Sequence, residues 1–356
     1  MMKSRVLSLT VVLAAGLWGQ AGPVGGVRVS GVVSGLAWGQ DLPAPGDSAA
    51  HVDLSNAMIL LSRTTGAVQF QAQVGAYNIP ILGAPYVTTA KTVRDLFGPV
   101  PVAYVKLPLG AHLSLEAGIL PSLIGAESTF SFQNQNLERG LLWNQENDVN
   151  RGLQLDAAGG GWQASVSWND GYFSSRYSWI SAALTRTLSG SQSVTVSGGG
   201  NWSHTAFRTL ATPVENNSRL LDLVYNLTGG RWTLQPYMQW TQVPANPAAG
   251  VRQGAGTWGA AALGKSKLGR GWSVAVRWEA IRTGGAGHPD AVNLLYGPGS
   301  GAWSWTVTPG WQRQHYFARL EASEVLVDRM APGGGFGRQG KGRRQARILV
   351  EAGIEF

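Results

Sequence analysis

The sequence contains no cysteine and few charged residues. Among its 356 residues, Asp, Glu, Lys and Arg make up 13%, whereas soluble domains have roughly 25%. Without cysteine the chain has no disulfide framework, which fits a protein exported to an oxidising compartment. The low charge is unusual for a soluble domain.

A long apolar run is also missing. Beyond the N-terminal segment, no uninterrupted apolar stretch reaches the about 18 residues that a transmembrane helix needs. The chain has instead 49 Gly and 15 Trp, which favours a membrane β-barrel over a helical membrane protein. No nucleic-acid motif accompanies the formal charge of +8, so we expect no nucleic-acid partner and place the basic residues in loops and lumen.

The first 21 residues have the features of a secretory signal. Lys3 and Arg5 precede an apolar core at 6–17, and Gly19-Gln20-Ala21 offers a cleavage site with small residues. An N-terminal anchor helix is the alternative, but the apolar run is too short to favour it. We expect removal of 1–21 and delivery of 22–356 to the outer membrane.

Segments of about ten residues with alternating polarity recur to the end of the chain. In the seventh, Trp162, Val166 and Trp168 oppose Gln163 and Ser165. The expected strands are 27–39, 51–63, 67–77, 101–109, 111–121, 151–158, 161–169, 177–188, 191–202, 217–228, 231–242, 255–266, 271–282, 301–313, 315–327 and 345–356. An even count is typical of bacterial single-chain barrels.

Connection lengths alternate along the chain. Short turns are expected at 64–66, 108–110, 159–161, 188–190, 229–231, 264–271 and 312–314. Longer segments separate them, the longest at 122–150. Tight periplasmic turns and long external loops produce this alternation, whereas a soluble β-sandwich has no reason to segregate loop lengths. The predicted fold class is all-β, a transmembrane antiparallel β-barrel of about sixteen strands.

The last strand ends in an aromatic residue. Along 345–356 apolar and polar residues alternate up to Phe356. This strand resembles the C-terminal signal of bacterial outer-membrane β-barrels, which implies recognition by the barrel-assembly machinery through Phe356. An edge strand of a soluble sheet is the alternative for this segment alone.

Tryptophans recur near both ends of the predicted strands. At about 3.4 Å per residue and a tilt of about 40°, their spacing suits aromatic rings just inside the two membrane interfaces. The core of a sandwich would also accommodate them. The expected aromatic girdle is Trp162, Trp168, Trp232, Trp240, Trp272 and Trp278.

The opposite strand faces are polar. An interior of about sixteen strands is too wide for side chains to fill, so a water-filled pore is expected. The predicted pore lining is Glu116, Arg277, Glu279, Arg319, Glu321, Arg347 and Glu351. We expect a passive diffusion channel for small hydrophilic solutes, with no enzymatic activity, cofactor or metal. Ion preference and solute identity stay open.

The long segment 122–150 is the third external loop. In general porins of this strand number the corresponding loop folds into the lumen, where charges set ion preference. The charges expected at the constriction are Glu127, Glu138, Arg139, Glu146 and Asp148. A loop that faces solvent is the alternative, and residues 136–144 could instead form another strand.

A family resemblance lies in the same region. Gly125-Ala126-Glu127, then Asn136 with Arg139, and Asn169-Asp170-Gly171 follow one another in this order. The stretch resembles the OmpL-like outer-membrane β-barrel porins over about a quarter of the chain. The resemblance implies a porin but no particular substrate, and a homotrimer is common for porins of this size.

Two motifs suggest other activities. Residues 259–266 match the phosphate-loop pattern, but a turn follows them instead of the helix that would meet the phosphate. The spacing of His112 and Ser114, with Glu116 next, resembles the pair of outer-membrane phospholipase, although we expect it on the lumen face. A non-channel barrel, either a lipid-modifying enzyme or an adhesin, is the alternative function, and a secreted β-rich protein is a third.

Basic residues gather before the last strand. Arg338, Lys341, Arg343 and Arg344 lie in a Gly-rich loop, for which a solvated loop is the default interpretation. The alternative is contact with lipopolysaccharide phosphates at the outer rim, or attraction of anionic solutes to the mouth of the pore. Outer-membrane lipid is an expected partner in any case. The five His have no metal-ligand spacing.

Overall fold

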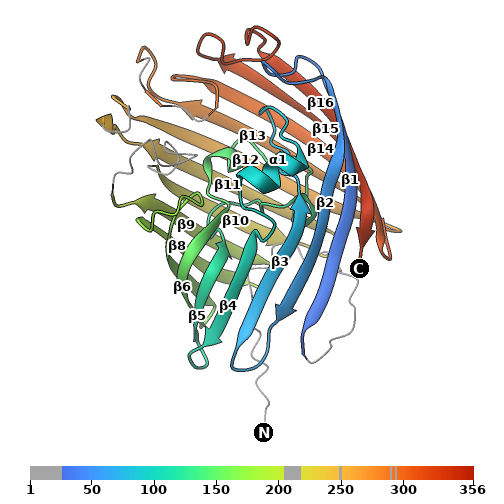
Figure 1. Cartoon of the computed structure of the whole chain (residues 1–356), viewed down its shortest axis with the longest axis vertical. Helices are drawn as coiled ribbons and strands as arrows, with labels where there is room; N and C mark the ends of the chain where they lie inside the picture. The colour runs from blue at the N-terminus through green and yellow to red at the C-terminus, as the bar shows by residue number, and fades with distance from the viewer. Residues whose placement is uncertain (1–25, 204–217, 248–250, 289–290, 293–294) are drawn as a thin grey trace.

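The strands form one closed barrel. The computed structural model describes residues 26–203, 218–247, 251–288, 291–292 and 295–356. Within them each strand pairs antiparallel with the next, and β1 pairs with β16 (Figure 1). The strands are β1 Arg28–Gln40, β2 Ala50–Arg63, β3 Gln69–Tyr77, β4 Val102–Pro108, β5 Leu113–Pro121, β6 Val149–Gly159, β7 Trp162–Asn169, β8 Trp179–Ser189, β9 Gln192–Asn201, β10 Arg219–Thr228, β11 Trp232–Val243, β12 Ala255–Gly269, β13 Trp272–Thr283, β14 Gly301–Arg313, β15 Tyr316–Arg329 and β16 Arg344–Glu355.

The predicted fold class is confirmed, and each predicted segment overlaps one observed strand. The turn expected at 264–271 is wrong, because β12 continues to Gly269. The hairpin turns at Arg270 and Gly271 alone, whose φ values are 53° and 87°. Two successive left-handed residues match the twist of the flanking strands, so no longer loop is needed. The phosphate-loop pattern 259–266 therefore lies within a strand.

The structure also contains elements that the alternation of polarity did not predict. A short helix, α1 Thr89–Asp95, lies in the second external loop, with Thr88 as its N-cap. Short 3-10 helices, η1 Ser131–Gln133 and η2 Trp143–Gln145, lie in the third. No helix in the described part of the chain has the length and apolar character to cross a membrane. The signal expected at 1–21 lies outside the described residues.

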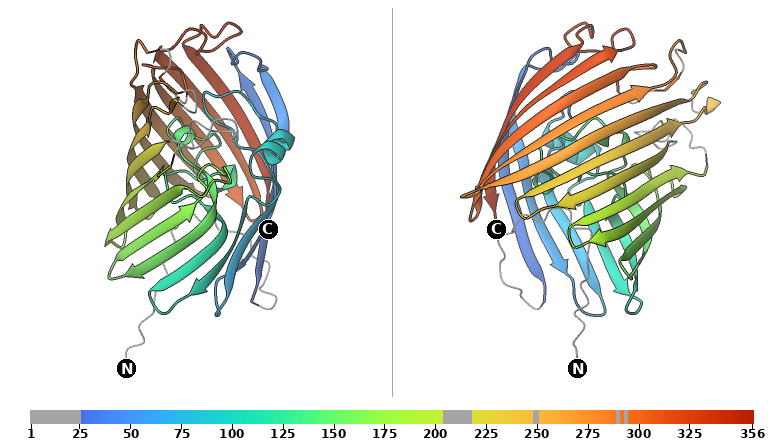
Figure 2. Two further views of the ribbon diagram at one scale, coloured as in Figure 1. Left: turned by 60° about the vertical axis from the view of Figure 1, so that its left-hand side comes forward. Right: turned by 180° about the vertical axis from the view of Figure 1, so that it is seen from behind.

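Loop lengths segregate by end of the barrel. Between strands, one end has the short connections 64–68, 109–112, 160–161, 190–191, 229–231, 270–271 and 314–315. The other end has the long ones, including 78–101 and 122–148, and Figure 2 shows the two rims. Short periplasmic and long external connections are the arrangement of outer-membrane barrels.

The C-terminal residue completes the closure at the end with the short turns. The Phe356 N–H donates to Gly31 O at 3.0 Å, and the Gly31 N–H donates to Phe356 O at 2.7 Å. A Cβ on Gly31 would lie 2.5 Å from the Phe356 ring. The glycine therefore provides the space in which the last aromatic side chain lies against β1.

We predict that Gly31→Val impairs closure. The valine side chain would displace the Phe356 ring and weaken the last rungs of the β1–β16 ladder. Gly39→Val is the matched control, since a Cβ at Gly39 meets nothing within 4 Å. Heat-modifiable gel mobility should reveal a smaller folded fraction for Gly31→Val alone. Equal folded fractions would contradict the assigned role of Gly31.

Candidate pore and its inward-folded loop

The third external loop, residues 122–148, folds into the barrel. The backbone N–H groups of Leu137 and Glu138 donate to the carboxylate of Glu321 on β15, at 2.5 and 2.8 Å. Those of Leu141 and Leu142 donate to Glu279 on β13, at 3.0 and 3.2 Å. Both carboxylates lie on lumen faces of their strands, and both views of Figure 2 place this segment inside the wall. Two wall carboxylates thus bind the loop backbone.

Ion pairs fasten the same loop by its side chains. Arg277 on β13 donates to Glu127 at 2.6 Å and to the backbone oxygen of Glu138 at 2.6 Å. Arg347 on β16 donates to Glu138 at 2.7 Å. All four side chains are buried. Removing one partner of a buried ion pair costs about 3–5 kcal/mol, so these contacts fix the position of the loop.

Arg139 of the loop binds its own segment instead of the wall. It is fully buried and donates to the backbone oxygens of Thr129, Asn136 and Leu137, at 3.2, 3.0 and 2.5 Å. Its backbone N–H donates to Pro80 O of the second external loop at 2.7 Å. The two loops therefore associate within the lumen.

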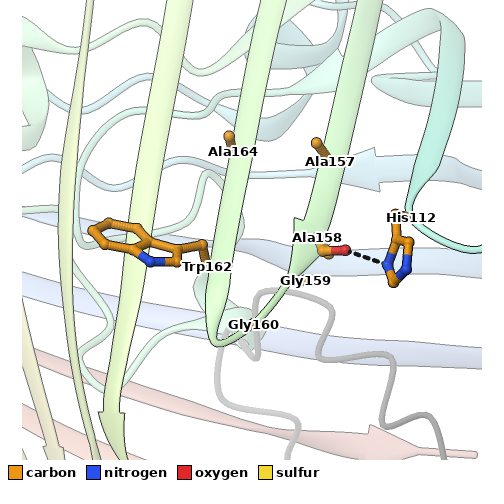
Figure 3. A pocket seen from close by; sticks show the side chains of 7 residues that line it. All are labelled: His112, Ala157, Ala158, Gly159, Gly160, Trp162 and Ala164. Carbon is orange, nitrogen blue, oxygen red and sulfur yellow. Dashed lines mark hydrogen bonds between the residues drawn. The ribbon is translucent and has the colours of Figure 1, made fainter.

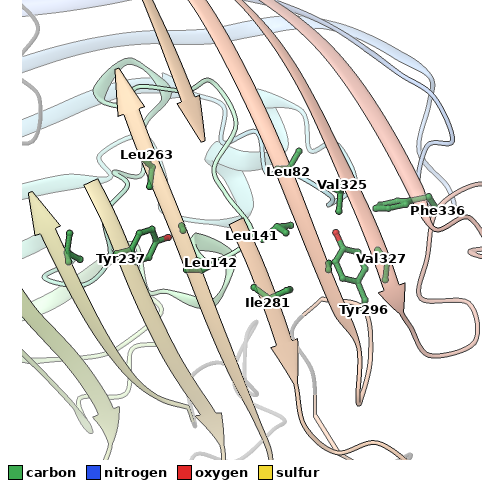
Figure 4. Packing of buried hydrophobic residues seen from close by; sticks show 13 residues of the cluster. Leu82, Leu141, Leu142, Tyr237, Leu263, Ile281, Tyr296, Val325, Val327 and Phe336 are labelled. Atoms are coloured by element: carbon green, nitrogen blue, oxygen red, sulfur yellow. The ribbon is translucent and has the colours of Figure 1, made fainter. Parts of the chain in front are cut away.

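Apolar packing completes the contact between loop and wall. Leu141 and Leu142 of the third loop and Leu82 of the second lie against lumen-facing side chains of β10 to β15 (Figure 4). Tyr296 and Phe336, from external loops, join the same cluster. These apolar residues fill part of the barrel cross-section at this level.

A polar network fastens residues 131–134 of the loop to the wall, where Asn56 on β2 donates to the Ser131 hydroxyl at 2.8 Å. Glu351 on β16 accepts hydrogen bonds from Ser34, Ser55 and Asn56, at 3.0, 2.5 and 3.1 Å. Arg319 on β15 pairs with Glu351 and also donates to the backbone oxygens of Ser131 and Asn134.

The structure places the five charges expected at the constriction in this loop, but mostly out of contact with water. Glu127, Glu138, Arg139 and Glu146 are buried between loop and wall, and Asp148 is half-buried. Of the predicted lining residues, Glu116 pairs with Lys106 at 2.7 Å on the β4–β5 wall. The others hold the loop: Arg277, Glu279, Arg319, Glu321, Arg347 and Glu351. Their part in ion selection stays a prediction.

The alternative of another strand at 136–144 is wrong. In this segment only Arg139 forms an isolated bridge, to Ile81, and η2 begins at Trp143. The carboxylates of Glu279 and Glu321 take up backbone N–H groups that a strand would pair with a neighbour. Sequence alternation could not reveal these partners, because they come from distant strands.

The side chains that face the lumen on β7 and β11 change from half-exposed near the short turns to buried farther along the strand. Near the short turns, the inward polar side chains on β7 and β11 are half-exposed, as at Gln163 and Thr233. Toward the middle of the same strands Ser167 and Gln239 are buried. The inward-folded loops cover the wall at that level, so these lumen side chains are more accessible near the short turns than in the middle of the barrel.

The tryptophans expected in the girdle lie on the outer wall. Five of them are exposed by 45–53%, and Trp240 is half-buried beside Trp258, with ring centroids 6.4 Å apart. Trp303 and Trp305 on β14 also face outward, which the sequence analysis missed. The alternation of outward and inward residues along β14 could have identified both as outward-facing. That these rings mark the membrane interfaces stays a prediction.

The His112 and Ser114 side chains do not contact each other. Nδ1 of His112 lies 2.9 Å from Ala158 O, whereas Ser114 donates to Asp156 at 3.4 Å. The hollow beside His112, of about 420 Å³, is lined otherwise by Ala, Gly and Trp162 (Figure 3). This region therefore presents no assembled nucleophile and base.

The barrel, its loop asymmetry and its inward loop define an outer-membrane porin-like barrel. The sequence profile of the family described as beta-barrel porin-2, OmpL-like, matches residues 26–356. The chain belongs to this family, which confirms the resemblance seen in the sequence. No curated protein matches the chain by sequence.

Solved outer-membrane proteins share the fold. OmpT of Vibrio cholerae is 10% identical with a TM-score of 0.60, and the match covers 94% of this chain and 99% of that one. The outer membrane channel DcaP of Acinetobacter baumannii is 9% identical with a TM-score of 0.60 and the same coverage. A trimer form of OmpT is 10% identical with a TM-score of 0.56, covering 93% and 99%. At these identities the likeness concerns the fold alone.

We predict that Arg277→Met loosens the third loop. The substitution leaves Glu127 buried without its cation, at a cost of about 3–5 kcal/mol. Arg139, buried in the native loop, should then become a site of trypsin cleavage in the folded barrel. Arg282→Met, which breaks an exposed pair with Asp328, should leave Arg139 protected. Protection in both variants would contradict the fastening role of Arg277.

Proposed function

We propose that the protein is a porin that lets small hydrophilic solutes diffuse passively across the outer membrane, without enzymatic activity. Family membership supports a porin role. The observation that carries the proposal is the third loop held inside a closed barrel by side chains of the wall, because a closed barrel of this width needs such a loop to limit passage. The loop is held by wall charges in one position, so the constriction has a defined size.

One observation favours a second candidate, a barrel that does not conduct. At the level of the third loop, lumen-facing residues such as Glu279, Glu321 and Ser304 are fully buried. A lumen filled at this level would suit a non-channel barrel, either a lipid-modifying enzyme or an adhesin. For the enzyme, Ser114 is the nucleophile to test.

The remaining expectations belong to the same proposal. Residues 1–21 would direct export, and the barrel-assembly machinery would recognise Phe356. Lipopolysaccharide and outer-membrane lipid would surround the outer wall, where Trp162 and its counterparts lie. A homotrimer is supported by the trimer form of the structurally similar OmpT.

We predict conductance steps for the purified protein in a planar bilayer. In the double variant Glu279→Ala, Glu321→Ala the loop loses its carboxylate partners, and conductance should rise at least about twofold as the constriction widens. Asp328→Ala, at the exposed outer rim, is the control and should conduct like the wild type. A reversal potential under a salt gradient then reports ion preference.

The absence of steps in wild type and double variant alike would reject the channel. Phospholipid hydrolysis that disappears in Ser114→Ala would instead support the enzyme. Hydrolysis unchanged in that variant would exclude this serine as nucleophile.

A further inference from the structure

Two buried carboxylates influence each other electrostatically where the third loop ends, and neither forms an ion pair within the part of the chain that the structure describes. Glu146 follows η2 in the loop, and Asp222 lies on the lumen face of β10. Their exposed fractions are 5% and 0%. No ion pair among the described residues includes either side chain, in contrast to Glu127 and Glu138 of the same loop.

Neighbouring charges do not compensate this pair. Burial raises the pKa of Glu146 well above its usual value, and the Asp222 carboxylate is the next largest cause. The next largest causes are also acidic groups, namely Glu127, Asp148 and Glu279. Of these, Glu127 and Glu279 pair with Arg277. Within the described residues, Glu146 and Asp222 have no such arginine partner.

Several buried oxygen atoms of these two residues and their neighbours have no hydrogen-bond partner in the described part of the chain. Both carboxylate oxygens of Asp222 and Oε2 of Glu146 are buried without a hydrogen bond of acceptable geometry, although Gln239 and the Gly125 N–H lie beside Asp222. Two neutral oxygens are equally unpartnered, the hydroxyls of Tyr237 and Ser197. Both residues are 2% exposed.

The register of the wall brings these groups together. Asp222 is directly opposite Ser197 on β9 and opposite Gln239 on β11. Gln239 donates from Nε2 to Oε1 of Glu146 at 2.8 Å, which joins the loop to the wall at this height. Tyr237 precedes Gln239 by two residues on the same lumen face, and Glu146 is the charged group named first among those that act on its hydroxyl.

We propose that Glu146 and Asp222, with the hydroxyls of Tyr237 and Ser197, bind one hard divalent cation of the calcium class. Two carboxylates supply the matching charge, and all candidate ligands are oxygen atoms, which Ca²⁺ prefers. The described residues hold no group of three or more acidic or imidazole side chains suited to a metal. Neutral oxygens therefore complete this site.

Calcium fits this arrangement better than magnesium does. The candidate oxygens come from a loop and from three adjacent strands, and they belong to carboxylates and hydroxyls of different reach. Ca²⁺ accepts irregular coordination by six to eight oxygens, whereas Mg²⁺ demands near-ideal octahedral geometry. The ion would fasten the end of the loop to β10, as arginines fasten its middle to β13 and β16.

The close packing at Gly125 supports a fixed site. Its φ is +90°, and a Cβ there would lie 1.7 Å from Oε2 of Glu146. The glycine thus lets the loop backbone pass directly beside the carboxylate.

The test uses the full barrel refolded without lipopolysaccharide, freed of metal by a chelator and titrated with CaCl₂ by calorimetry. One saturable site per chain is expected, and Asp222→Asn or Glu146→Gln should weaken Ca²⁺ binding at least about tenfold. Asp156→Asn, which removes a lumen carboxylate elsewhere, is the matched control and should keep wild-type affinity. Ca²⁺ should also raise the unfolding temperature of the wild type but not of Asp222→Asn.

Two milder variants protect the test against misfolding. Tyr237→Phe and Ser197→Ala remove only neutral oxygens, and heat-modifiable mobility verifies that each variant forms the barrel. Each should weaken binding severalfold. If the wild-type protein binds no Ca²⁺ at millimolar concentration, the proposal is overturned. The two carboxylates would then share a proton instead of a cation. Binding that persists in both carboxylate variants also overturns the proposal. Ca²⁺ binding is measured independently of conductance, so failure of the calcium proposal can be distinguished from failure of the channel proposal.

Discussion

Inside a lipid bilayer, a strand cannot leave its backbone N–H and C=O groups unpaired, and every other feature of this barrel depends on that constraint. The chain meets it by pairing each strand with its neighbour and β16 with β1. Closure requires the first and last strands to pair, and the Gly31–Phe356 contact provides the last hydrogen bonds of that ladder. With no free edge, one face of every strand can lie in lipid.

Closure at sixteen strands produces an interior that the wall alone cannot fill. The second and third external loops enter this space and bring backbone groups that themselves need partners. Glu279 and Glu321 accept those N–H groups, while Arg277 and Arg347 neutralise the acids of the loop. Much of the small charge content of the chain therefore serves contacts within the lumen, where a buried charge must be paired.

The alternation of apolar and polar residues at every second position was sufficient to locate the strands, because one face of each strand meets lipid and the other meets the lumen. It located β7 and β13 within a residue or two and assigned Trp162, Trp278 and Glu279 to the faces that the structure has. It failed at the turn after β12, where Gly264 suggested a loop and the left-handed residues Arg270 and Gly271 make the turn. The alternation pattern also gave no signal for α1, because a helix of only seven residues is too short to show a helical period in the sequence.

The sequence by itself predicted the antiparallel barrel of about sixteen strands, the segregation of short and long connections to opposite rims and the side that residues of the clearly alternating strands face, since all of these follow from local alternation and loop length. Only the tertiary structure decided that residues 122–148 enter the lumen and which wall residues hold them. Glu138 and Arg347, like Glu146 and Gln239, are far apart in the chain. Such contacts depend on how the closed wall brings distant strands around one loop, which no local pattern records.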